Sequence, residues 1–205
     1  NFIYDGVTTV VTGNCGLSNV DLGLYFRQLD SVKTSVNVAS LIGHNDVRKA
    51  VMGTVNRAAT PSEQQAMEAL VEKAMKDGGV GLATGLIYVP GTYSKTEEVV
   101  GLAKVAARYG GVYASHIRYE GDEILKAIDE AVEIGRQANI PVQISHFKVS
   151  GQNNWGRSKE TIAAVENARR EGIDVTIDQY PYTASSTGLN TLLPSWALAG
   201  GLDSI

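Results

Sequence analysis

Four side chains that can bind a metal ion or exchange protons stand at the ends of short apolar runs in this sequence. The chain contains one cysteine and three histidines. They end the four runs Val7–Cys15, Val36–His44, Gly111–His116 and Pro141–His146. Each run has the length and the β-branched content of a buried parallel strand. If these strands are neighbours in one sheet, their carboxyl ends converge, and a thiolate and imidazoles meeting there would form a zinc site on a barrel rim.

The segments between these runs are predicted to be helices with recognisable end signals. Capping boxes begin helices at Thr60 and at Ser94, and each helix ends at a pair of glycines. A third helix with one apolar stripe is predicted over Asp122–Asn139, and a fourth begins at Ser158. Two further strands are expected, at Gly79–Gly85 and Gly172–Asp178.

This alternation predicts an α/β fold built from about six βα units, either an open doubly wound sheet or part of an eight-stranded TIM barrel. The barrel is favoured because polar residues follow nearly every strand, whereas a doubly wound sheet concentrates its site at one switch point. No glycine-rich dinucleotide fingerprint opens a helix. We therefore expect residues 1–205 to be one domain, a partial catalytic (β/α)8 barrel that comprises strands 2 to 7.

The amino-acid composition limits the kinds of partner that the protein is expected to bind. The formal net charge is −4, with acidic and basic residues mixed along the helices, so we expect no nucleic-acid-binding surface and no membrane-binding surface. No run reaches the roughly 18 apolar residues that cross a bilayer, and no basic-then-apolar leader is visible. A single cysteine forms no intramolecular disulfide and fits a reducing compartment, so a cytoplasmic protein is expected.

Five motifs resemble one family of hydrolases, in the same order and along nearly the whole chain. They are Gly6–Gly16, Thr84–Pro90, Ser115–Arg118, Ile144–Lys148 and Asp178–Thr187. With these motifs the sequence is similar to the D-aminoacylases, the N-acyl-D-amino-acid deacylases of the amidohydrolase superfamily. The Gly-Asn-Cys-Gly segment around Cys15 is especially specific, because most members of the superfamily use a carbamylated lysine or a glutamate there.

The resemblance implies an amidohydrolase-type barrel and a zinc-dependent enzyme that cleaves the amide bond of a small N-acyl-D-amino acid. It implies that the protein ligands of zinc are Cys15, His116 and His146. Lys148 would pair with the α-carboxylate of the substrate, and Tyr180 would support the polarised carbonyl oxygen. Ser186 and Tyr88 would contact the substrate. Neither the oligomeric state nor the substrate side chain is indicated.

The sequence also departs from the family pattern. The family begins its barrel with a His-x-His pair on the first strand and ends it with an aspartate, the general base, on the eighth strand. Neither strand is recognised here, and the flanking β domain is absent too. We therefore expect an internal part of such a barrel, able to bind one zinc ion and inactive by itself.

Other functions stay open at this point. A metal-free cysteine hydrolase would use Cys15 as nucleophile, a histidine as base and Asp178 to orient that histidine. A cyclic-amide hydrolase of the dihydroorotase or hydantoinase type, or a metal-binding barrel without activity, would also fit the pattern.

Four further polar residues near strand ends have expected roles outside the ligand set. His44 is expected at the rim, hydrogen-bonded near the site. Asp178 would orient a ligand or cap the turn after its strand. Arg118 and Glu120 are expected to pair with each other.

Overall fold

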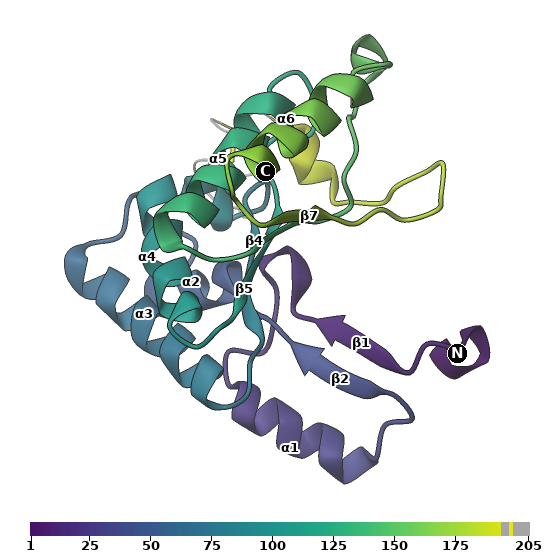
Figure 1. The fold of residues 1–205 in the computed structure, drawn as a ribbon. Helices are drawn as coiled ribbons and strands as arrows, with labels where there is room; N and C mark the ends of the chain where they lie inside the picture. The colour runs from purple at the N-terminus through teal and green to yellow at the C-terminus, as the bar shows by residue number, and fades with distance from the viewer. Residues whose placement is uncertain (194–196, 199–205) are drawn as a thin grey trace.

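The computed structural model describes residues 1–193 and 197–198 of the chain. The described strands run parallel and pair in sequence order, β1 with β2, and β3 through β7 in one sheet. They are β1 (Thr9–Thr12), β2 (Asn37–Ser40), β3 (Ile42–Gly43), β4 (Gly81–Gly85), β5 (Val112–His116), β6 (Val142–Ile144) and β7 (Val175–Ile177). This sequential order is that of a barrel, since a doubly wound sheet reverses its order at a switch point. Figure 1 shows the strands with the helices beside them.

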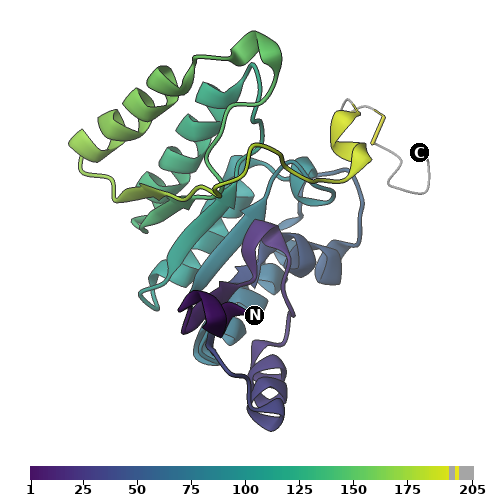
Figure 2. The ribbon, with the colours of Figure 1, turned by 90° about the vertical axis from the view of Figure 1, so that its right-hand side faces the viewer.

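Helices connect most of the strands. They are α1 (Leu22–Val32), α2 (His44–Met52), α3 (Pro61–Lys76), α4 (Thr96–Ala107), α5 (Ile124–Ala138) and α6 (Ser158–Arg170). Of these, α2 to α6 pack against strands β3 to β7. From α2 to α6 each helix packs against the next, and Figures 1 and 2 show this row beside β4 and β5. The 3-10 turns are η1 (Phe2–Asp5), η2 (Asn14–Gly16), η3 (Gly91–Tyr93), η4 (Gln152–Asn154) and η5 (Leu189–Leu192).

The hydrophobic core lies between this row of helices and the strands. Helix α5 buries the apolar stripe predicted from its sequence, including Ile124, Ile128 and Ala131. Ile124 and Ile128 are fully buried, and each such side chain contributes about 1.5–3 kcal/mol of transfer free energy. Strand β4 is buried along its whole length, as expected of a parallel strand in the middle of a sheet.

All six predicted strands are present, but the run Val36–His44 is divided. Its first part, β2, pairs with β1, and its second part, β3, pairs with β4. His44 does not end a strand but begins α2, a helix that the sequence did not predict. The first helix, α1, was not predicted either; the side chain of Asp21 caps it by accepting the N–H of Leu24 at 2.9 Å.

One of the two predicted capping boxes is confirmed. At Thr60 both reciprocal hydrogen bonds with Glu63 are formed at the start of α3. The box at Ser94 is wrong: its Oγ donates to the carbonyl of Gly91, and Lys95 is the residue that precedes α4. None of the described helices has the length and hydropathy of a membrane span.

Candidate metal centre

Two of the predicted ligands stand at the ends of neighbouring strands. His116 is the last residue of β5, and His146 follows the end of β6 by two residues. The parallel register places Ser115 opposite Ile144, so the two histidines emerge at the same edge of the sheet. Their rings meet edge to face with centroids 4.3 Å apart. His146 Nε2 lies 2.7 Å from His116 Nδ1.

Cys15 reaches the same place from a more distant strand. It lies in η2, directly after β1, and this turn contacts β3, β4 and β5. Two glycines permit the close approach. A Cβ on Gly43 would collide with the backbone of Gly16, and a Cβ on Gly85 would collide with the carbonyl oxygen of Cys15. The thiol thereby comes to 3.7 Å from His146, measured from Sγ to Nε2.

The three donor groups have the chemistry of zinc ligands and lie near enough to share one metal ion. Their ligand atoms all lie within 4.8 Å of one another. Around zinc, with ligand bonds of about 2.3 Å to sulfur and 2.0–2.1 Å to nitrogen, sulfur and nitrogen should be about 3.6 Å apart and two nitrogens about 3.3 Å. The Sγ–Nε2 distance of 3.7 Å matches, and the Nε2–Nδ1 distance of 2.7 Å is shorter by roughly half an ångström. One thiolate and two imidazoles leave a fourth position open, as in catalytic zinc sites.

Two of the three candidate ligands have an unusual backbone conformation. Cys15 and His146 lie in the left-handed region, with φ of 56° and 42°. Such a conformation costs a non-glycine residue about 1–2 kcal/mol and is concentrated at functional sites. Asp178 stabilises the turn at His146, because its Oδ1 accepts the backbone N–H of His146 at 2.5 Å. Asp178 therefore contacts the backbone of His146, and it does not orient the ring as a cysteine hydrolase would require.

The two histidines differ in protonation. Burial lowers the pKa of His116 to about 4. Burial also acts to lower the pKa of His146, but hydrogen bonds to Cys15 and Glu120 outweigh it and raise that pKa to about 9. At neutral pH His146 is therefore the donor and His116 the acceptor in their contact. A cation that binds at His146 Nε2 must displace a proton.

A cavity of about 410 Å³ opens beside the three donors, a size suited to a small molecule. It is lined by all four residues predicted to contact the substrate, Tyr88, Lys148, Tyr180 and Ser186. The ring of Tyr88 lies 4.8 Å from that of His116, centroid to centroid, and its hydroxyl bonds Thr187 Oγ1 at 3.1 Å. The Lys148 ammonium lies 5.8 Å from the centroid of the Tyr180 ring. Ser186 and Thr187 belong to the segment after β7, coloured yellow-green in Figure 2.

Glu120 also lines this cavity, and the sequence gave it a different partner. The expected pair between Arg118 and Glu120 is wrong. Arg118 instead forms two hydrogen bonds of 2.9 Å with the carboxylate of Glu130 on α5. Glu120 turns toward the histidines and lies 2.5 Å from Lys148, from Oε1 to Nζ. Burial acts to raise the pKa of Glu120, but its bonds to His146 and Lys148 hold it at about 2.

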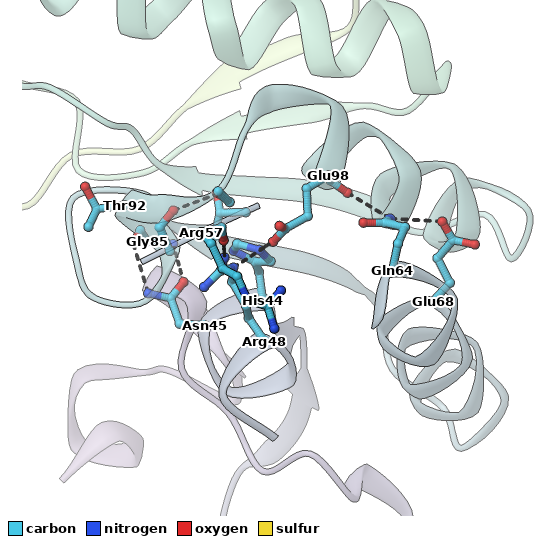
Figure 3. Close-up of polar contacts among 12 residues, drawn as sticks. His44, Asn45, Arg48, Arg57, Gln64, Glu68, Gly85, Thr92 and Glu98 are labelled. Carbon is cyan, nitrogen blue, oxygen red and sulfur yellow. Dashed lines mark hydrogen bonds and ion pairs between the residues drawn. The ribbon is translucent and has the colours of Figure 1, made fainter. Parts of the chain in front are cut away.

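His44 lies in a separate cluster behind the site. Its Nε2 is 2.8 Å from Glu98 Oε1, and the same oxygen accepts the Nε–H of Arg48 at 3.1 Å. Figure 3 shows these side chains between α2 and α4. His44 is fully buried and does not line the cavity beside the three donors, so its expected place at the rim is wrong. Its neighbour Asn45 does approach the site loop, bonding both backbone polar groups of Gly85.

Comparisons with known proteins find relatives among the D-aminoacylases and the N-acyl-D-amino-acid deacylases. D-aminoacylase from Alcaligenes xylosoxydans xylosoxydans is 41% identical over 210 residues, which cover 91% of this chain and 43% of that protein. Solved structures of D-aminoacylase superpose on the chain with a TM-score of 0.83 at 41% identity. The match covers 88% of this chain and 43% of theirs. These structures are described as a subset of the amidohydrolases and as having a binuclear metal centre. N-acyl-D-glutamate deacylase from Bordetella bronchiseptica, solved with zinc and a phosphonate inhibitor, has a TM-score of 0.84 at 38% identity and the same coverage. No protein-family model matches the chain.

These similarities confirm the resemblance to the D-aminoacylases and N-acyl-D-amino-acid deacylases of the amidohydrolase superfamily. They also confirm the predicted fold, part of an amidohydrolase TIM barrel. The chain spans about 43% of the length of these relatives.

Proposed function

We propose that the protein hydrolyses the amide bond of N-acyl-D-amino acids at a zinc centre held by Cys15, His116 and His146. The observation that carries the proposal is the convergence of these three donors, within 4.8 Å of one another, beside a cavity. The relatives at 38–41% identity are deacylases of this type, and one is solved with zinc. In this proposal residues 1–205 form part of a single catalytic barrel, and the partner is a small-molecule substrate.

The side chains around the cavity would divide the work of binding and polarisation. A bound zinc ion would polarise the acyl oxygen and lower the pKa of water to about 7. Lys148 would fix the α-carboxylate of the substrate as a point charge, because a third N–H remains beside those that bond Glu120 and the carbonyl oxygen of His146. The Tyr180 hydroxyl would donate to the carbonyl oxygen as negative charge develops there. Tyr88 and Ser186 would form the walls that hold the substrate in place.

The metal-free cysteine hydrolase has less support. An activated cysteine nucleophile needs a low-pKa environment such as the N-terminus of a helix, with one histidine as its base. Cys15 lies in a three-residue turn and faces two histidines that contact each other. A thiolate ligand must stay reduced, so we also propose a reducing compartment, the cytoplasm.

The test combines metal analysis with a substrate panel. The purified protein that carries residues 1–205 within its complete barrel is expected to retain zinc. It should release D-amino acids from a panel of N-acetyl-D-amino acids with neutral and acidic side chains, with the L-enantiomers as controls. Activity should disappear with a chelator and return with zinc. A zinc-replete protein that hydrolyses no member of the D-panel, or a chelated protein that keeps its activity, would refute the proposal.

The role of Lys148 can be tested separately. Lys148→Met should raise KM by about tenfold or more, because a hydrogen bond to a charged group is worth about 1.5–3 kcal/mol. Lys126→Met is the matched control, since Lys126 is exposed on α5 and pairs only with Glu123 among the described residues. An unchanged KM in Lys148→Met would mean that a group other than Lys148 binds the α-carboxylate of the substrate.

A further inference from the structure

Glu120 contacts three groups of the candidate site through one carboxylate oxygen. Its Oε1 lies 2.5 Å from Lys148 Nζ, 3.1 Å from His146 Nδ1 and 3.8 Å from His116 Nε2. Its side chain is only 14% exposed, so water competes weakly for these contacts. We propose, on the basis of the proposed function, that Glu120 is a positioning residue that keeps the lone pair of His146 Nε2 directed at the metal.

The two ring nitrogens of His146 face different partners. Nε2 faces Cys15 and His116, on the side of the donor cluster, whereas Nδ1 faces Glu120. A neutral imidazole that binds a metal through one nitrogen carries its proton on the other. A carboxylate only accepts hydrogen bonds, so Glu120 holds the proton at Nδ1, and the lone pair at Nε2 can ligate once a cation has displaced the proton there.

Lys148 is the competitor for the same nitrogen. Its Nζ lies 3.1 Å from His146 Nδ1. An ammonium only donates, so a bond from Lys148 to Nδ1 needs the lone pair there and moves the ring proton to Nε2, where it blocks the metal. Glu120 prevents this by engaging Lys148 and accepting from Nδ1 with the same oxygen.

The surrounding chain leaves Glu120 free for this task and holds it in place. Arg118, two residues earlier, is bound by Glu130 and by the carbonyl oxygens of Thr92 and Ser94. The carbonyl of Glu120 accepts the backbone N–H of Ser150 at 2.6 Å, which ties its loop to the loop after β6. Through Glu120, the loop that follows His116 is therefore bonded to the loop that follows His146.

The experiment measures zinc affinity by competition with a chromophoric chelator at fixed pH. Glu120→Ala should raise the zinc Kd by about 10- to 100-fold, the usual effect of losing a residue that orients a metal ligand. Adding Lys148→Met should restore most of the affinity, because the competing donor is then gone. Glu123→Ala, on the same loop but exposed and paired with Lys126, should match wild type.

A purely structural role for Glu120 gives a different pattern. In that case the double variant would bind zinc no more tightly than Glu120→Ala, and this result would overturn the proposal. A zinc Kd of Glu120→Ala within twofold of the wild-type value would also overturn it. If Glu120→Ala fails to fold, Glu120→Gln replaces it. The amide oxygen of the glutamine can accept the Nδ1–H but binds the Lys148 ammonium weakly. The zinc Kd of Glu120→Gln should therefore exceed that of wild type, and an equal Kd would contradict the proposal.

The readout needs no substrate, so this inference and the proposed function fail separately. A wild-type protein that retains no zinc refutes the zinc centre itself. A wild-type protein that binds zinc, with Glu120→Ala binding equally well, refutes only the role of Glu120.

Discussion

Glu98 compensates two buried basic side chains behind the candidate metal centre, and its removal should be costly. His44 and Arg48 are fully buried, and both contact Glu98 Oε1, at 2.8 and 3.1 Å (Figure 3). In Glu98→Ala the guanidinium of Arg48 would keep, among the described residues, the carbonyl oxygens of Val55 and Arg57 as its partners. Removing one member of a buried ion pair costs about 3–5 kcal/mol.

Urea and thermal unfolding measure this loss. For a chain of this size each kcal/mol lowers Tm by roughly 2–4 °C, so Glu98→Ala should lower it by about 6–20 °C. Glu97→Ala is the matched control, because Glu97 is the exposed neighbour on the same helix, and its effect should stay within about 0.5 kcal/mol. A loss below about 1 kcal/mol in Glu98→Ala would refute the reasoning that the cluster depends on this carboxylate.

The same carboxylate predicts a dependence on pH. Burial acts to raise the pKa of Glu98, but the hydrogen bond from His44 and the charges of His44 and Arg48 hold it below its ordinary value of 4.5. The folded state thus binds this proton more weakly than the unfolded state. The stabilisation is complete above about pH 4.5 and is lost as pH falls through the lowered pKa. The free-energy advantage of wild type over Glu98→Gln should therefore shrink in that acid range, and a constant difference from neutral to acid pH would contradict it.

Three further substitutions test the metal site and two helix ends. Cys15→Ala should abolish zinc retention, measured by metal analysis after dialysis, whereas retained zinc with lost activity would favour a nucleophilic cysteine. Thr60→Ala should cost about 1 kcal/mol in urea unfolding by removing the capping box of α3, with the exposed Gln65→Ala as control. Lys33→Gly should stabilise the protein by about 1 kcal/mol, because Lys33 ends α1 with a φ of 53°. Lys33→Ala keeps that strain, so an equal gain in Lys33→Ala would contradict this explanation.

The sequence predicted the strands and the convergence of Cys15, His116 and His146 because one physical rule governs both. Runs rich in β-branched residues form buried parallel strands, and the carboxyl ends of such strands lie at one edge. The sequence did not show at which residue a single extended run stops pairing with one strand and begins to pair with another. The run Val36–His44 changes its pairing at Leu41, whose backbone N–H donates to Thr12 while the following residues pair with β4. No local residue pattern marks that change.

Charge partners were harder to predict than strands. Arg118 and Glu120 are close in sequence, yet Arg118 pairs with Glu130, twelve residues away on α5. The choice depends on how α5 packs against α4 and β6, which is tertiary information. The capping box at Ser94 failed for a similar reason, because its hydroxyl is used by the carbonyl of Gly91 in the preceding turn.

The donor distances of the candidate metal site are set by turns rather than by strands. His116 still belongs to β5 and is fixed by the sheet, whereas Cys15 and His146 lie beyond their strands in left-handed turns. The register of β5 and β6 therefore brings the rings to one edge, but the donor distances depend on the turns at Cys15 and His146. The opening of about half an ångström that zinc requires between the imidazoles should thus come from His146, whose turn is held by Asp178 and whose ring is held by Glu120. This explains why two carboxylates that bind no metal in our proposal both contact the same ligand.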